Sequence, residues 1–230
     1  MADAQKITAA FYDVDGTLVR TNIVHTYAYY AIHSAHISER LSKTASLLAN
    51  IPLYWAADKL DRFIFNEQFY KNYEGMSEDR LHVLGDEIFE KIIKPNLFPG
   101  AASLIARSKE QGHRQVLVSG ALDVVTQQLA RHLGFDDMLV NRLEIQDGFA
   151  TGRLLRPFVA GPAKALLVRQ YAEQHHIDLD KSFAYADSGS DLPMLSVVGY
   201  PCAVNPDLRL RTTAHAHGWP VLTLNDPDLG

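Results

Sequence analysis

Short apolar runs alternate with longer stretches in which apolar residues recur every three or four positions. The short runs are typical of buried strands and lie at residues 7–12, 115–119, 182–186, 200–204 and 220–224. The longer stretches have the spacing of one helix face and lie at residues 101–111, 122–133 and 162–174. Strands that alternate with helices of this length predict an α/β fold with a Rossmann-like, mainly parallel sheet flanked by helices.

One long stretch, residues 22–94, shows no convincing strand pattern. Its clearest feature is a helical stripe that begins near Ser77 and includes Leu81, Leu84 and Ile88. The stretch is rich in Tyr and Phe; we expect most of these side chains to pack a helical core and the rest to be available to line a pocket. We therefore predict an inserted helical cap at 21–95 and a core domain formed by 1–20 and 96–230.

A hairpin is predicted in the second half of the chain. Residues 139–145 and 149–155 read as two strands, and they flank Asp147-Gly148. This dipeptide favours a tight two-residue turn because both positions tolerate positive φ angles.

Reactive residues stand where the predicted strands and helices meet. Asp13 and Asp15 follow the first strand, and Lys164 lies near the start of a helix. Two further strand ends carry the remaining candidates, Ser119, Gly120, Asp187 and Asp191. Since ligands of open α/β sheets bind outside the carboxyl ends of the strands, we expect all these residues to meet at one edge.

These residue types indicate phosphoryl chemistry on a metal ion. Buried carboxylates repel one another unless a cation lies among them, and oxygen-only ligands suit Mg²⁺. The Ser119 hydroxyl, the Gly120 amide and the Lys164 ammonium are donors that a phosphoryl group needs. Of the first two acids, one can serve as an ionised nucleophile and the other as a proton donor. Taken alone, each piece is a common turn or cap; Asp191 in particular would also suit the N-terminus of a helix.

Composition narrows the function further. Lys and Arg total 22 against 27 Asp and Glu, a net charge of −5, so a nucleic-acid-binding surface is not expected. The single Cys excludes an internal disulfide and a Cys-based zinc site. Without a signal-peptide pattern at the start or an apolar stretch of about 18 residues, we expect a cytoplasmic protein with no membrane contact, acting on a small phosphorylated metabolite.

The order of these residues resembles the haloacid dehalogenase superfamily of phosphohydrolases. The family's first motif matches Asp13-Val-Asp-Gly-Thr17, and its second matches Ser119-Gly120. Its third and fourth motifs match Lys164 and the pair Asp187 and Asp191. An insertion between the first two motifs corresponds to the family's C1 cap. A helical cap of this kind is similar to subfamily IB, the phosphoserine phosphatase-like branch.

The resemblance implies a role for each matched residue. Asp13 would be the nucleophile and a Mg²⁺ ligand, and Asp15 the general acid, with its backbone carbonyl on the metal. Asp187 would bind Mg²⁺ directly, and Asp191 would act from beside the metal or through water. The matched Ser119, Gly120 and Lys164 would hold the phosphoryl oxygens.

The substrate is less defined, because the chain departs from the phosphoserine phosphatase pattern. That branch has a Glu where this chain has Asn22, and a cap Arg near the position of Phe69 or Tyr70. Phosphoserine, another amino-alcohol phosphate such as histidinol phosphate, and phosphoryl transfer to an alcohol therefore all stay open. A receiver-like signalling module that carries a phosphorylated Asp is the alternative from another class.

Overall fold

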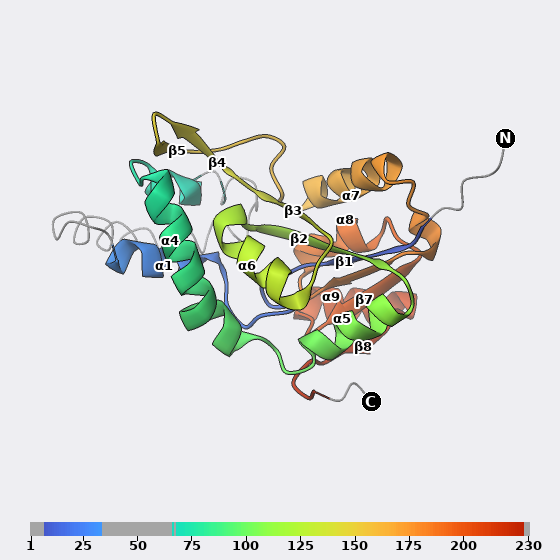
Figure 1. The fold of residues 1–230 in the computed structure, drawn as a ribbon. Helices are drawn as coiled ribbons and strands as arrows, with labels where there is room; N and C mark the ends of the chain where they lie inside the picture. Colours follow the sequence, from blue (N-terminus) through green and yellow to red (C-terminus); the bar gives the residue numbers. More distant parts are fainter. Residues whose placement is uncertain (1–6, 34–65, 67, 228–230) are drawn as a thin grey trace.

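The computed structural model describes residues 7–33, 66 and 68–227, and its centre is a six-stranded sheet (Figure 1). Its strands are β1 (Ala9–Tyr12), β2 (Arg114–Leu122), β3 (Asp137–Asn141), β6 (Phe183–Ala186), β7 (Tyr200–Val204) and β8 (Val221–Leu222). They lie in the order β3-β2-β1-β6-β7-β8, and every neighbouring pair is parallel. The predicted α/β fold with a mainly parallel sheet is confirmed.

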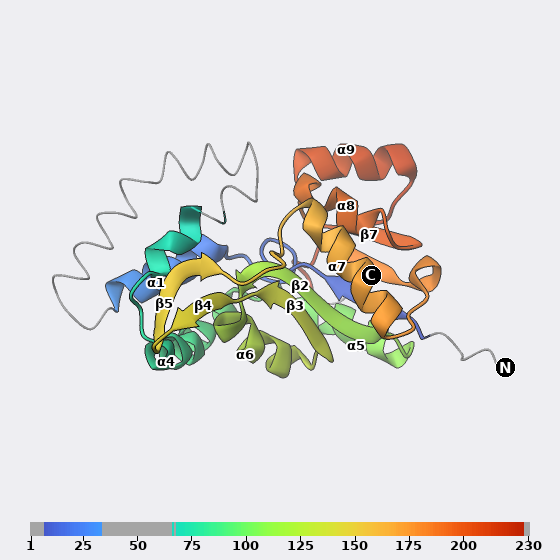
Figure 2. The ribbon, with the colours of Figure 1, turned by 90° about the horizontal axis from the view of Figure 1, so that it is seen from above.

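Helices cover both faces of this sheet. They are α5 (Ala101–Glu110), α6 (Asp123–Leu133), α7 (Pro162–Gln174), α8 (Leu192–Leu195) and α9 (Leu208–His217). Alternate side chains of β1 point to opposite faces, so Phe11 packs with α7, α8 and α9 while Tyr12 packs with α5. Figure 2 shows the same division, with α7, α8 and α9 above the sheet and α5 and α6 below. Across the described helices, none combines the length and the apolar character that a bilayer crossing demands.

The chain between β1 and α5 is helical wherever the structure describes regular elements. These are α1 (Ile23–Ile32), η1 (Lys71–Tyr73), α4 (Glu78–Ile88), the π-helical turn η2 (Phe89–Ile93) and η3 (Lys94–Asn96). The predicted stripe is present on α4, where Leu81, Leu84 and Ile88 are buried. The division into a cap at 21–95 and a core at 1–20 and 96–230 stays a prediction.

Aromatic side chains form the centre of this helical segment. Tyr27 lies 5.0 Å from Tyr73 and 5.5 Å from Phe69 between ring centroids, and all three side chains are buried. They belong to one hydrophobic cluster with residues of α6, including Val125. The expected aromatic packing is therefore present among the described residues; Tyr54, Trp55, Phe63 and Phe65 lie outside them.

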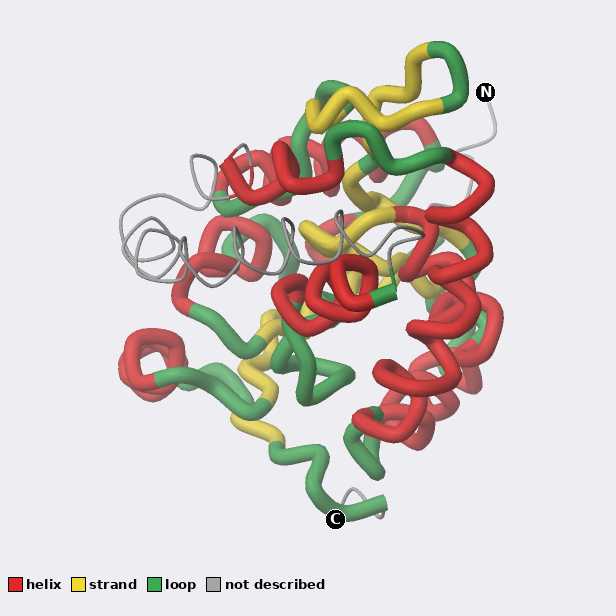
Figure 3. The backbone as a smooth tube through the Cα atoms, turned by 90° about the vertical axis from the view of Figure 1, so that its left-hand side faces the viewer, coloured by secondary structure: helices red, strands yellow, loops and turns green. Residues whose placement is uncertain are grey.

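The prediction of a single strand at 139–145 is wrong, because the structure has two strands there. The chain leaves the main sheet after Asn141, and β4 (Leu143–Gln146) then pairs antiparallel with β5 (Phe149–Leu154). Figure 3 shows this hairpin at one end of the molecule. Its turn is the predicted one, with φ of 51° at Asp147 and 80° at Gly148. Asn141-Arg142 is a polar pair between apolar residues, but a strand can continue through such a pair, so the pattern does not specify a change of partner there.

Candidate active site

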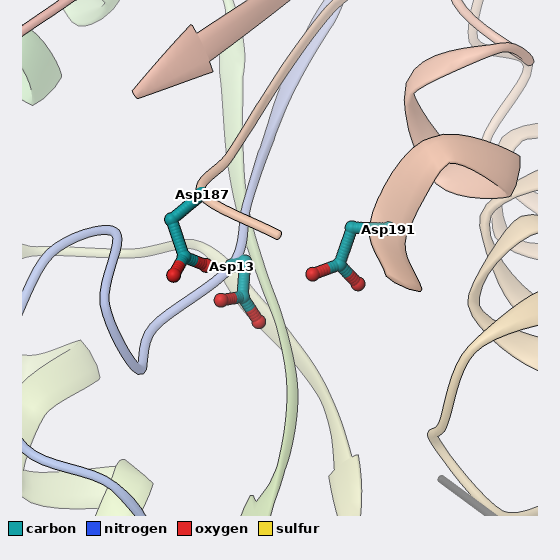
Figure 4. A group of neighbouring side chains, drawn as sticks. All are labelled: Asp13, Asp187 and Asp191. Atoms are coloured by element: carbon teal, nitrogen blue, oxygen red, sulfur yellow. The ribbon is translucent and has the colours of Figure 1, made fainter. Parts of the chain in front are cut away.

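Charged residues from two strand ends and two helix starts meet at one edge of the sheet. Asp13 comes directly after β1, and Asp187 directly after β6. Lys164 lies in the first turn of α7, and Asp191 directly precedes α8. Figure 4 shows the carboxylates of Asp13, Asp187 and Asp191 gathered around one space. A parallel sheet produces this arrangement because its strands all end at the same edge.

Lys164 connects two of these carboxylates. Its Nζ lies 2.6 Å from Oδ1 of Asp13 and 2.7 Å from Oδ1 of Asp191, and all three side chains are nearly fully buried. Burial by itself would lower the pKa of Lys164, but the charges of Asp13 and Asp191 outweigh it and raise that pKa above its ordinary range. The ammonium therefore stays protonated and holds a fixed positive charge at the site.

The acidic cluster is suited to a divalent cation. Asp13, Asp187 and Asp191 each offer one carboxylate oxygen, and these oxygens lie within 4.8 Å of one another. Burial, reinforced by the negative charges of Asp13 and Asp191, raises the pKa of Asp187 to about 8. Lys164 alone thus does not balance the three carboxylates. A hard ion with oxygen ligands, of which Mg²⁺ is the common example, fits both the charge and the donor atoms.

Gly16 and Thr17 hold the first acidic loop against Asp187. The Thr17 hydroxyl lies 3.2 Å from Oδ2 of Asp13 and 3.3 Å from Oδ1 of Asp187. Gly16 has a φ of 83°, and a Cβ there would lie only 2.1 Å from Oδ2 of Asp187. The glycine is therefore required both by its left-handed backbone and by the approach of this carboxylate.

All seven residues singled out from the sequence line one pocket: Asp13, Asp15, Ser119, Gly120, Lys164, Asp187 and Asp191. Its volume is about 50 Å³. At roughly 10–15 Å³ for each water, a space of that size holds only a few water-sized groups. It suits a phosphoryl group and an ion better than a large molecule. Ile23 and Asn66 reach the same pocket from the helical segment.

Two residues that support the site were missed, although their position gave a signal. Asn205 and Asp207 follow β7, another strand that ends at this edge. Asn205 Nδ2 donates to the carbonyls of Gly16 and Thr17, both at 3.4 Å. The N–H of Asp207 donates to the carbonyl of Asp187 at 2.7 Å, and the Asp207 carboxylate accepts from a backbone N–H in the loop that follows Asp187. Ligands of such a sheet bind outside the carboxyl ends of its strands, and this rule, which identified the other site residues, applies to Asn205 and Asp207 as well.

The residues at or near the positions where the phosphoserine phosphatase-like branch has its Glu and cap Arg have other roles in this chain. Asn22 is exposed and caps α1, since its Oδ1 accepts hydrogen bonds from the N–H groups of Val24 and His25. Phe69 is packed in the aromatic cluster. Tyr70 is buried and donates to the carbonyl of Gly120 at 2.6 Å. Among the described residues that line the pocket, Lys164 is the only cation.

No sequence pattern assigns Tyr70 to the site. Burial, followed by the negative charge of Asp15, raises the pKa of Tyr70 above its ordinary range. Its hydroxyl therefore keeps its proton and acts as a donor.

Comparison with known proteins agrees with this geometry. Residues 10–196 match the model of the haloacid dehalogenase-like hydrolases. A protein named "probable phosphatase" from Mycobacterium tuberculosis is 31% identical over 222 residues, 96% of this chain and 76% of that protein. A phosphoserine phosphatase from the same organism, SerB1, is 32% identical over 214 residues, 93% of this chain and 70% of that protein.

Solved structures share the fold. A protein of unknown function from Bordetella pertussis superposes with a TM-score of 0.82 at 24% identity, over 96% of this chain and all of that chain. A phosphoserine phosphatase solved as a phospho-aspartyl intermediate analogue superposes with a TM-score of 0.68 at 19% identity, over 98% of this chain and 95% of that chain. The chain belongs to the haloacid dehalogenase-like hydrolase family and is a phosphatase of that family.

Proposed function

We propose that the chain hydrolyses phosphate monoesters of small metabolites, with Asp13 as the nucleophile and Asp15 as the general acid. The observation that supports this most is the 2.6 Å ion pair between Lys164 and Asp13, in a pocket that also holds Asp15 and Ser119. The ion pair places a positive charge beside the buried Asp13 carboxylate, and a carboxylate is the nucleophile that this reaction needs.

The reaction takes place in two displacements. A carboxylate oxygen of Asp13 bonds to phosphorus while the bond from phosphorus to the ester oxygen breaks. Asp15 donates its proton to that oxygen, so the alcohol leaves neutral. Water then attacks the phosphorus of the aspartyl-phosphate and gives a proton to Asp15. The bond from phosphorus to Asp13 breaks, so inorganic phosphate is released and the Asp13 carboxylate is restored.

The phosphoryl group is held by donors from two elements. The Ser119 hydroxyl and the Gly120 amide belong to β2, and the Lys164 ammonium belongs to α7. These groups are fixed before the substrate arrives, so they stabilise the charge that develops on the phosphoryl oxygens without first reorganising.

The same pocket would hold the metal ion. The carboxylates of Asp13 and Asp187, with the backbone carbonyl of Asp15, would be the ligands, and Asp191 would support them directly or through water. When bound, Mg²⁺ supplies positive charge that offsets these acids and the incoming phosphate. Burial, together with its acidic neighbours, raises the pKa of Asp187, so such an ion would favour its ionised form.

For the substrate we propose a small phosphorylated amino acid or amino alcohol. The relatives named phosphoserine phosphatase support phosphoserine as the first compound to test. The neutral side chains of Ile23 and Asn66 in the pocket, and the capping role of Asn22, support the wider class that includes histidinol phosphate.

A substrate panel tests the proposal. Phosphate release is measured from p-nitrophenyl phosphate, phosphoserine, histidinol phosphate and sugar phosphates, with Mg²⁺ and with EDTA. We expect Mg²⁺-dependent turnover that disappears in Asp13→Asn. A stable aspartyl-phosphate without turnover would instead identify a receiver-like module. Phosphorylation of an added alcohol in place of water would identify a phosphotransferase.

A further inference from the structure

β2 is irregular at the point where it contributes to the pocket. Its register with β3 passes from Ser119 to Leu122 while β3 advances by a single residue. Gly120 and Ala121 therefore have no partner in that ladder. Bulges of this kind re-aim side chains beside active sites, and the backbone groups that they release must find other partners.

The Gly120 carbonyl finds two partners outside the sheet. It accepts a hydrogen bond from the Tyr70 hydroxyl at 2.6 Å and another from Asn141 Nδ2 at 2.8 Å. The Asn141 amide is itself oriented, because its Oδ1 accepts from the Val159 N–H at 2.8 Å. Tyr70 and Asn141 are fully buried, and the two bonds use both lone pairs of the carbonyl oxygen.

This carbonyl is connected to the Ser119 hydroxyl through one peptide unit. The C=O of Gly120 and the N–H of Ala121 lie in the same rigid plane, and that N–H donates to Ser119 Oγ at 3.1 Å. The hydroxyl oxygen is thus an acceptor toward the backbone, which leaves its own hydrogen available to donate to a phosphoryl oxygen in the pocket. Donors on the carbonyl also polarise the peptide and strengthen its N–H as a donor.

We propose that Tyr70 is a positioning residue for the phosphate-binding hydroxyl of Ser119, an inference that rests on the proposed phosphatase function. Tyr70 is not among the residues that line the pocket, so it acts on the phosphate through the Gly120 peptide. Because it belongs to the chain segment that precedes α4, it makes phosphate binding depend on how that segment packs against β2. Asn141, which belongs to β3, donates to the same Gly120 carbonyl from within the sheet.

The first experiment compares two equivalent substitutions, Tyr70→Phe and Tyr30→Phe. Tyr30 is the matched control, since it is equally buried and also donates to a backbone carbonyl, that of Leu81, at 2.7 Å. Each variant loses one hydrogen bond, so both should melt at similarly lowered temperatures. We expect Tyr70→Phe to lower kcat/KM on p-nitrophenyl phosphate by about 5- to 10-fold, the loss of one hydrogen bond, and Tyr30→Phe to leave it unchanged.

The second experiment is a double-mutant cycle with Ser119→Ala. If Tyr70 acts through the Ser119 hydroxyl, Tyr70→Phe should change kcat/KM by less than about 2-fold in the Ser119→Ala background. An equal loss in both backgrounds would overturn the proposal, as would a Tyr70→Phe variant indistinguishable from Tyr30→Phe. A residue with a purely structural role would not show this dependence on Ser119.

A binding measurement separates this inference from the proposed function. The Kd of inorganic phosphate in the presence of Mg²⁺ is measured by calorimetry for the wild type, Tyr70→Phe and Tyr30→Phe. We expect about 5-fold weaker binding for Tyr70→Phe alone. Absence of turnover on every ester, with phosphate binding still weakened by Tyr70→Phe, would refute the phosphatase function and retain the role of Tyr70. Turnover with unchanged phosphate affinity in Tyr70→Phe would retain the phosphatase function and refute the role of Tyr70.

Discussion

The residues at the sheet edge and the residues of the helical segment line the same pocket with different chemistry. The sheet edge contributes charged groups, here called the floor: Asp13, Lys164, Asp187 and Asp191. The described part of the helical segment contributes the neutral side chains of Ile23 and Asn66, here called the wall. Ion pairs of 2.6 and 2.7 Å fix the floor, whereas the wall belongs to a segment held by aromatic packing.

From this contrast we expect the floor to determine the reaction and the wall to determine which substrate is accepted. Under the proposed function, the charges of the floor would bind the phosphoryl group and a cation, whatever alcohol is attached. The wall would then contact the alcohol, and its described side chains offer shape and an amide rather than charge. Variants of the floor should therefore stop turnover on every ester, and variants near the wall should affect stability or selectivity. The following predictions test that separation, beginning with the largest effect.

Asp13→Asn should lower kcat by at least about 10³-fold on every ester, because an amide is a poor nucleophile. The fold should survive, since Lys164 keeps its contact with Asp191. Phosphate release and thermal melting are the two measurements. Turnover above about one hundredth of the wild-type rate would show that the floor does not supply the nucleophile.

Lys164→Met should lower kcat by about 10²- to 10³-fold, the usual effect of losing one charged donor to the transition state. It should also lower the free energy of unfolding by about 3–5 kcal/mol, because it removes the cation that lies beside two buried carboxylates. Chemical denaturation measures the second effect. The control is Lys94→Met, which removes an exposed ion pair with Glu90 and should change neither quantity. Equal changes in kcat and in the free energy of unfolding for the two variants would contradict the role given to the buried Lys164 ammonium.

Gly16→Ala tests the close approach within the floor. Its control is Gly112→Ala, because Gly112 has nearly the same φ, 81°, but no atom within 4 Å of an added Cβ. Both variants should lose about 1–2 kcal/mol of unfolding free energy through backbone strain. Gly16→Ala should lose about 1–3 kcal/mol more, since its methyl group must displace Asp187. Activity should fall only in Gly16→Ala. Matching stabilities in denaturant would show that Asp187 moves aside freely.

Asn22→Ala should have the smallest effect on catalysis. Loss of the α1 cap should reduce stability by about 1 kcal/mol, and Asn22→Asp should retain most of it. Because Asn22 is exposed and does not line the pocket, kcat/KM should stay unchanged on both phosphoserine and histidinol phosphate. Steady-state kinetics on the two esters is the measurement. A selective loss on one of them would place residue 22 in the wall.

The floor was predictable from sequence because each of its residues is tied to a local signal. Asp13 and Asp187 end apolar runs, and Lys164 lies at the start of an amphipathic stretch. A parallel sheet then brings these separate signals to one edge. The helix at 162–174 and the strand at 200–204 occur with the predicted bounds for the same reason, since strong periodicity and turn residues mark their ends.

The wall and the Gly120 contacts were not predictable in the same way. The positions of Tyr70 and Asn66 depend on how the helical segment packs against β2, and the position of Asn141 depends on the pairing of β3 with β2. No local pattern reports either arrangement. The division of the predicted strand at 139–145 has a similar cause, because the change of partner from β2 to β5 is a tertiary feature that the polar pair Asn141-Arg142 does not by itself specify. The domain boundaries at 20/21 and 95/96 remain predictions.

The place of β1 in the sheet determines when the site can exist. β1 is the first strand of the chain, yet it lies between β2 and β6. The Thr17–Asp187 hydrogen bond spans 170 residues of sequence, and the Lys164–Asp13 bond spans 151. Contacts so distant along the chain form late in folding because they close long loops. During synthesis, the first loop must therefore wait for most of the chain to leave the ribosome before it acquires its contacts with Lys164 and Asp187.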